Sequence, residues 1–181
     1  MKKYELTDET IKLSGNRVLH RIVALRDFSN VKKGNKGGWI EKEENLSHEG
    51  NCWVFDNAWA FSSAEVGGNA KVGGYAIVMD NAIVGGNAQV GGNAKIRSDA
   101  KITNNKDYMV FKNWWSSGRY FTWTRSNDKW TVGCFYGTGE ELINKAYADS
   151  EDKGKHYEEI VEYVNKCVLG KEKFNTNKTN I

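Results

Sequence analysis

The sequence predicts a mainly β chain in which very short strands wind repeatedly about one axis, followed by a small unit of strands and helices. The main observation is a series of aliphatic residues six positions apart, and alanine follows four residues after each of the first eight. A period of six fits neither the 3.6 residues of a helical turn nor the longer strands of a hairpin meander. The series comprises Val54, Ala60, Val66, Val72, Val78, Val84, Val90, Ile96 and Ile102.

The residues between these positions predict sharp corners. The chain has no proline but 19 glycines, and Gly, Asn, Asp or Ser separates the aliphatic residues. We expect Asn and Gly at the corners because both tolerate positive φ, whereas β-branched residues do not. The aliphatic side chain is expected to point inward from each short strand. Alanine is expected where the chain bends towards the axis and a larger side chain would collide.

This pattern resembles the hexapeptide repeat of the left-handed parallel β-helix family, which includes acyltransferases and γ-class carbonic anhydrases. The resemblance covers roughly residues 40–103 and implies three hexads in each coil. Val54 would then stack on Val72 and Val90. Ile40 and Leu46 extend the register if two residues bulge out near residues 48–51, which gives about three to four coils. Such a short solenoid has two open ends and needs caps.

The flanking segments supply those caps. Residues 1–38 are predicted to form an N-terminal β cap, with strands over residues 4–28 and a turn at Ser14-Gly15-Asn16. The coil takes residues 39–105. Residues 106–169 are predicted to form a β-β-β-α-α unit with strands at 108–111, 119–125 and 129–135, and Thr138 with Glu141 forms a capping box before the first helix. Residues 170–181 read as a disordered polar tail.

One outer wall of the coil is predicted to be an oligomer interface. The residues beside Ala60, Val78 and Ile96 point away from the axis, and four of them are large and apolar: Trp59, Phe61, Ile77 and Met79. Such a cluster needs covering. We expect a homo-oligomer, with a trimer favoured as in the family. The alternative is that the chain's own end segments pack on this wall.

The sequence offers little support for catalysis. The family's enzymes use histidine, but His20, His48 and His156 all lie outside residues 54–102 and show no metal-ligand spacing. We therefore expect no metal, no cofactor and no catalytic residue, and a non-catalytic protein is favoured over an enzyme. His48 is expected to be an exposed residue of the bulge. Cys52, Cys134 and Cys167 are interpreted as small apolar fillers, the thiol of Cys134 being buried and inert.

Residues 111–130 contain the candidate ligand site. Aromatic side chains alternate with arginine there, a combination that can stack a base and hold a phosphate. The alternative is that these aromatic residues form the core of a small domain, with the arginines as edge charges. The candidate ligand-binding residues are Trp114, Arg119, Tyr120, Trp123 and Arg125.

Charge and terminal sequence limit the partners. The net charge of +3 is too small to predict a nucleic-acid coat, and no apolar run is long enough for a membrane helix. The N-terminus turns polar where a signal peptide needs its apolar core, so we expect a protein of the bacterial cytoplasm. Segments 37–41, 45–47 and 133–138 resemble uncharacterised phage and prophage proteins. That resemblance implies a phage-type binding protein, for example a counter-defence protein that sequesters a small anionic or nucleotide signal or blocks a host protein. The alternatives are an acyltransferase-like enzyme and a structural scaffold.

Overall fold

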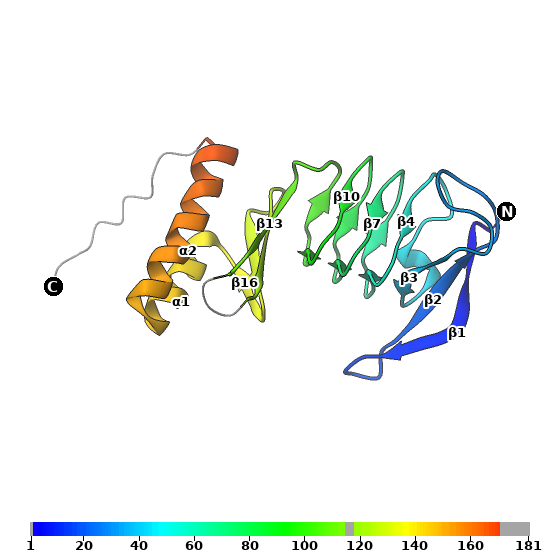
Figure 1. Cartoon of the computed structure of the whole chain (residues 1–181), viewed down its shortest axis with the longest axis horizontal. Helices are drawn as coiled ribbons and strands as arrows, with labels where there is room; N and C mark the ends of the chain where they lie inside the picture. Colours follow the sequence, from blue (N-terminus) through cyan, green and yellow to red (C-terminus); the bar gives the residue numbers. More distant parts are fainter. Residues whose placement is uncertain (1, 115–117, 171–181) are drawn as a thin grey trace. The chain divides into compact units, whose positions relative to one another are not determined.

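The hexads wind into a parallel β-solenoid of about four turns, in a chain that is mainly β and carries two helices near its C-terminus (Figure 1). The structure is a computed structural model that describes residues 2–114 and 118–170. The chain divides into two compact units, Met1–Cys134 and Phe135–Ile181. The strands predicted at 108–111 and 119–125 lie in the first unit. The predicted tail lies outside the described residues from position 171 onwards.

Three walls of stacked strands form the solenoid, as the repeat predicted. The first wall contains β3 (Lys36–Ile40), β5 (Trp59–Ala60), β8 (Ile77–Val78) and β11 (Lys95–Ile96). The second contains β4 (Trp53–Val54), β7 (Lys71–Val72) and β10 (Gln89–Val90), and the third β6 (Glu65–Val66), β9 (Ile83–Val84) and β12 (Lys101–Ile102). All pairs within these walls are parallel. The predicted stacks are confirmed, and every inward aliphatic side chain of the series is buried.

The corners differ from the prediction in one respect. Positive φ occurs two residues after each of the first eight inward residues, at Gly68, Gly74, Gly86 and Gly92 and also at Asp56, Ser62, Asp80 and Ser98. At five of these corners asparagine follows this position and is not at positive φ, so its expected role at the corner is wrong. It instead joins successive turns, since the Asn51 amide donates to Asn69 and the Asn69 amide donates to Asn87. At Gly68 a Cβ atom would also approach the backbone of Gly86 within 3.1 Å.

The first turn contains the predicted bulge. Ile40 pairs with Ala60 and Leu46 bridges to Val66, so both offsets are two residues longer than the usual eighteen. The additional residues lie between Leu46 and Trp53, where Gly50 adopts a positive φ of 64°. Both Ile40 and Leu46 are fully buried. The prediction that two residues bulge out near 48–51 is confirmed.

At the strand ends and corners of the coil, the backbone N–H groups donate towards the following turn, as Trp59 does to Ala76 and Lys71 does to Ala88. The last turn therefore has N–H groups without a ladder partner. Side-chain oxygens of the next segment accept four of them: Gln89 to Asn105, Gly91 to Tyr108, Lys95 to Thr122 and Lys101 to Ser126, at 2.7–3.2 Å. The segment contains β13 (Tyr108–Lys112), β14 (Tyr120–Thr124) and β15 (Lys129–Val132), which pair antiparallel in that order.

The first turn needs hydrogen-bond donors, because no preceding turn donates to its carbonyl groups. Tyr4 donates its hydroxyl to the carbonyl of Leu46 at 2.7 Å, and Arg21 donates to the carbonyl of Asp56 at 2.8 Å. These residues belong to the hairpin of β1 (Tyr4–Lys12) and β2 (Val18–Ala24), and β2 pairs antiparallel with β3. The predicted hairpin turn is confirmed, with Gly15 and Asn16 at positive φ.

The second unit contains β16 (Phe135–Gly137), α1 (Gly139–Asp149) and α2 (Glu151–Tyr163), and a π-helical turn, Val164–Val168, follows α2. The capping box is confirmed, since Thr138 accepts from the Glu141 N–H and the Glu141 carboxylate accepts from the Thr138 N–H. The predicted strand at 129–135 stops at Val132 because Gly133 takes a positive φ, and β16 was not predicted. No helix among residues 2–114 and 118–170 is long and apolar enough to cross a membrane.

Asp107 closes the loop that leaves the coil. Its carboxylate accepts hydrogen bonds from the N–H and hydroxyl of Thr103 and from the N–H and amide of Asn104. Burial raises the pKa of Asp107, but these hydrogen bonds outweigh it and hold the pKa below its ordinary value. The ionised carboxylate therefore stabilises the fold.

The substitution Val78→Asp should unfold the coil, because it places an unpaired charge at the axis. We expect a loss of about 4 kcal/mol or more in the free energy of unfolding, measured by chemical denaturation. Gln89→Asp introduces the same charge at an exposed, outward position and should change stability by less than about 0.5 kcal/mol. Equal melting of Val78→Asp and the native protein would contradict the register.

Acid should weaken the native protein through Asp107. Because its pKa is lowered in the fold, its contribution is complete above the unfolded pKa and is lost as the pH falls through the folded pKa. Asp107→Ala should cost about 1–2 kcal/mol at pH 7, and its difference from the native protein should shrink in acid. Lys106→Ala, at an exposed neighbouring position, serves as the control for urea denaturation measured across this pH range.

Candidate functional site

A groove runs along the first wall of the coil. We call it the aromatic groove, and it has a volume of about 550 Å³. Its floor follows from the strand register, because Trp39 pairs with Trp59, Trp59 with Ile77 and Ile77 with Lys95. These four residues precede the inward positions and so point outward. The complete lining is Ile11, Trp39, Asn57, Trp59, Tyr75, Ile77, Asn93, Lys95 and Tyr120.

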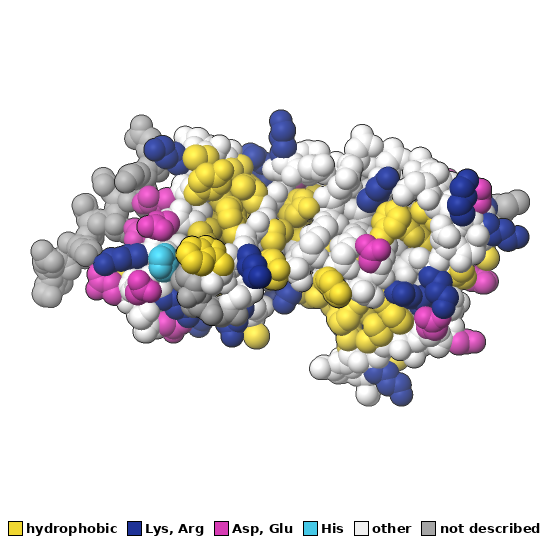
Figure 2. All heavy atoms as spheres, in the orientation of Figure 1, with side chains coloured by type: hydrophobic (Ala, Val, Ile, Leu, Met, Phe, Trp, Pro, Cys, Tyr) yellow, Lys and Arg dark blue, Asp and Glu magenta, His cyan; other side chains and the backbone are white. Residues whose placement is uncertain are grey.

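The ends of the aromatic groove come from segments outside the coil. Ile11 belongs to β1 of the hairpin and Tyr120 to β14, so the two caps of the solenoid each contribute one residue. Hydrophobic side chains gather between the turn end of the hairpin and the coil in the surface view (Figure 2). The side chain of Tyr75 is 64% exposed. The groove thus offers aromatic surface that a flat ligand could cover.

The charge of the aromatic groove is positive. Lys95 is the charged residue of the lining, and no carboxylate of the described residues belongs to it. The Lys95 backbone is anchored through its hydrogen bond to Thr122. Beside the groove, the Arg21 guanidinium lies 4.8 Å from the ring centroid of Trp39. Asn57 and Asn93 add amide donors and acceptors. Aromatic rings, amides and a cation suit an anionic ligand with a planar ring.

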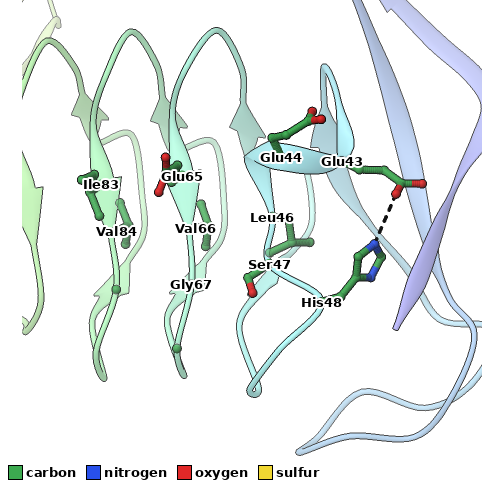
Figure 3. A pocket seen from close by; sticks show the side chains of 12 residues that line it. Glu43, Glu44, Leu46, Ser47, His48, Glu65, Val66, Gly67, Ile83 and Val84 are labelled. Atoms are coloured by element: carbon green, nitrogen blue, oxygen red, sulfur yellow. Dashed lines mark hydrogen bonds and ion pairs between the residues drawn. The ribbon is translucent and has the colours of Figure 1, made fainter. Parts of the chain in front are cut away.

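A second pocket lies on the third wall and has the opposite charge. We call it the acidic pocket; its volume is about 450 Å³, and Figure 3 shows its lining. Glu43, Glu44 and Glu65 supply three carboxylates, and the exposed Ile83 adds apolar surface. The remaining lining residues are Leu46, Ser47, His48, Val66, Gly67, Gly68, Val84 and Gly85.

His48 is held by three contacts and leaves no basic nitrogen for catalysis. Its Nδ1 accepts the N–H of Lys3 at 3.2 Å, so the proton of the neutral ring lies on Nε2. Nε2 faces the Glu43 carboxylate at 3.5 Å, and the two side chains point toward one another in Figure 3. The ring also stacks on Tyr4 with centroids 4.3 Å apart. The predicted exposed bulge residue is therefore a half-buried anchor of the N-terminal strand.

The other two histidines, His20 and His156, lie on other elements of the chain. His20 Nδ1 lies 3.1 Å from the carbonyl of Thr7 in the hairpin, and His156 lies near Asp152 and Glu159 on α2. Within residues 2–114 and 118–170, no group of three His, Cys, Asp or Glu side chains could hold a metal ion. The cysteine prediction is confirmed in part: Cys52 is buried, whereas Cys134 and Cys167 are exposed. The burial expected of Cys134 is wrong because the strand before it ends at Val132.

The five candidate ligand residues are not brought into one cavity. Tyr120 lines the aromatic groove, whereas Trp114 is 82% exposed at the end of β13. Trp123 is fully buried, and its indole N–H donates to Asp128 at 2.9 Å. Arg125 donates to the carbonyl of Lys106, and the Arg119 side chain lies beside Gly133. The burial of Trp123 agrees with the alternative in which these aromatic residues form a core.

The four candidate interface residues all lie on the outer side of the first wall. Trp59 and Ile77 form part of the floor of the aromatic groove. The Arg17 guanidinium of the hairpin lies 5.3 Å from the ring centroid of Phe61, so the hairpin covers part of this wall. Met79 is half-buried. Four residues of the lining were not predicted from the sequence: Trp39, Asn57, Tyr75 and Asn93. The strand register could have found Trp39, but nothing in the hexad predicts the approach of Ile11.

Comparison with known proteins supports the repeat and little else. The chain is 41% identical over 63 residues to the uncharacterized acetyltransferase YdcK of Escherichia coli K-12. The coil is a hexapeptide-repeat β-helix. The match covers 31% of this chain and 19% of YdcK, so the chain spans about a fifth of that protein's length. No family model matches the chain.

Proposed function

We propose that the chain is a non-catalytic binding protein that holds a small anionic ligand with a planar ring, of the nucleotide class, in the aromatic groove. The observation that carries this proposal is the lining of the groove. It combines Trp59 and Tyr75 with Lys95, and no carboxylate of the described residues lines the groove. Stacking on an aromatic side chain is worth about 1–3 kcal/mol for each base. A lysine adds a point charge for a phosphate.

The contrast between the two cavities supports the choice of site. Three glutamates line the acidic pocket, whereas the aromatic groove carries Lys95 with Arg21 nearby. A nucleotide would be repelled by the former and attracted by the latter. The aromatic groove is also the larger of the two.

An acyltransferase is the second candidate, and the printed name of YdcK is what favours it. Acyl-CoA contains a nucleotide, so it shares the chemistry that the aromatic groove offers. A transferase also needs a base near the acceptor, and the unprotonated nitrogen of His48 is already occupied by the Lys3 N–H. We therefore propose binding in preference to transfer, and we propose a ligand class without assigning a phage or counter-defence target.

Assembly into a trimer is part of this proposal. Phe61 and Met79 lie on the same wall as the groove but do not line it. A second copy could cover these side chains and leave the aromatic groove open to a ligand. Oligomer formation and ligand binding can therefore be tested with different residues.

Titration with AMP and with acetyl-CoA tests the ligand proposal. Isothermal calorimetry should detect binding of at least one of them, and Trp59→Ala and Lys95→Gln should each weaken it by about tenfold or more. Lys101→Gln removes an exposed lysine from the third wall and should leave the affinity unchanged.

Two results would count against the proposal. Absence of binding to both compounds would remove the nucleotide class, and equal affinity of Lys95→Gln and the native protein would remove the site. Release of free CoA from acetyl-CoA in the presence of an amine or alcohol acceptor would instead favour the acyltransferase.

Sedimentation of the native protein should show a trimer. Phe61→Glu combined with Met79→Glu should reduce it to a monomer, because the two charges would be buried against the neighbouring copy. Glu65→Gln on the third wall serves as the control and should leave the trimer intact. A native monomer, or an intact trimer of the double variant, would exclude this interface.

A further inference from the structure

A buried lysine and a buried cysteine meet at the first turn of the coil. The Lys3 side chain is fully buried, and its Nζ lies 2.9 Å from the carbonyl oxygen of Cys52 and 3.4 Å from that of Glu49. The same Nζ lies 3.2 Å from the sulfur of Cys52, which is also fully buried. Lys3 thus donates to the unpaired carbonyls of the first turn, and the thiol is the third group that its amine touches.

The surroundings favour reaction between these two groups. Burial lowers the pKa of the Lys3 amine, which increases the fraction of neutral, nucleophilic amine. The other cysteines of the chain, Cys134 and Cys167, are both exposed and free, whereas Cys52 is buried beside Lys3. Glu49, whose carbonyl contacts both Lys3 and Cys52, belongs to the bulge, and its side chain is exposed. The proposal requires that a small oxidant reach the sulfur through the bulge.

We propose that Lys3 and Cys52 form a reversible covalent sulfur–nitrogen bond when hydrogen peroxide oxidises the thiol. In the first step the Cys52 thiol releases its proton and the thiolate attacks peroxide, an S–O bond forms as the O–O bond breaks, and the departing hydroxide takes up that proton and leaves as water. This gives a sulfenic acid and uses the two oxidising equivalents of one peroxide. In the second step Nζ attacks the sulfur, the S–N bond forms as the S–O bond breaks, and a second water leaves. The product has lost two hydrogens relative to the reduced pair.

The bond would fasten the N-terminal strand to the end of the coil. Residue 3 precedes β1 and residue 52 precedes β4, so the link closes a long loop that contains the hairpin, β3 and the bulge. Closing a long loop restricts the unfolded chain. Oxidation should therefore raise the melting temperature of the first unit, by roughly 5 °C.

Peptide mapping by mass spectrometry tests this bond. The full chain with Cys134→Ser and Cys167→Ser is treated with hydrogen peroxide and cleaved after acidic residues without a reductant. We expect a linked species that joins the peptides containing Lys3 and Cys52 and has lost two hydrogens relative to their sum. A thiol reductant should restore both peptides and reverse the rise in melting temperature. Lys3→Arg keeps the positive charge but should abolish the linked species.

Three outcomes would overturn the proposal. The first is a sulfinic acid on Cys52 with Lys3 unmodified, and the second is an unchanged Cys52 after peroxide treatment. The third is a linked species with an additional oxygen, which would exclude a direct sulfur–nitrogen bond. Peptide mapping of the chain with Cys134→Ser and Cys167→Ser distinguishes these outcomes by itself. The test therefore remains valid even if Lys3→Arg fails to fold.

Discussion

The structure depends on the backbone hydrogen bonds that join each turn of the coil to the next, and at the strand ends and corners the N–H groups donate to the following turn. Because each turn donates to the next, the coil ends in unpaired N–H groups at one side and begins with unpaired carbonyls at the other. An unpaired backbone group that is buried costs roughly as much as a lost hydrogen bond. The two caps therefore need opposite chemistry: Thr122 and Ser126 accept at one end, whereas Tyr4, Lys3 and Arg21 donate at the other.

These caps also explain why the surface of the coil forms a groove. Outward positions of the first wall form a straight row, because the strands pair without a shift from Trp59 through Ile77 to Lys95. A row alone is an open surface. It becomes a groove where Ile11 and Tyr120, which belong to the two capping segments, stand at its ends. Both the protection of the coil ends and the proposed ligand site thus use the same strands, β1 and β14.

The six-residue period predicted the features of the coil itself, but it does not predict how the segments outside the coil pack against it. The inward side chains, the three walls and the two-residue bulge all follow from spacing, as does the outward direction of Trp59 and Ile77. The approach of Ile11 to the groove does not, because it depends on how a hairpin folds back on the coil. Trp123 resembled a ligand residue because aromatic and arginine residues alternate around it, yet its indole donates to Asp128 inside the sheet. Alternation marks the two faces of a strand, and here both faces of β14 are covered, since Thr122 is buried as well. The contact between Lys3 and Cys52 joins residues that are far apart in the sequence, so no local sequence pattern predicts it.

Because paired residues of neighbouring turns are eighteen positions apart, the number of turns sets the distance between the two caps. Adding or deleting one complete set of three hexads in the middle of the repeat would move the two caps apart or together by about 4.8 Å and leave their chemistry intact. Ile11 and Tyr120 would shift with the caps, while the row between them would gain or lose a single rung. The length of the groove can therefore change by simple duplication of three hexads, without any change in the residues at either end.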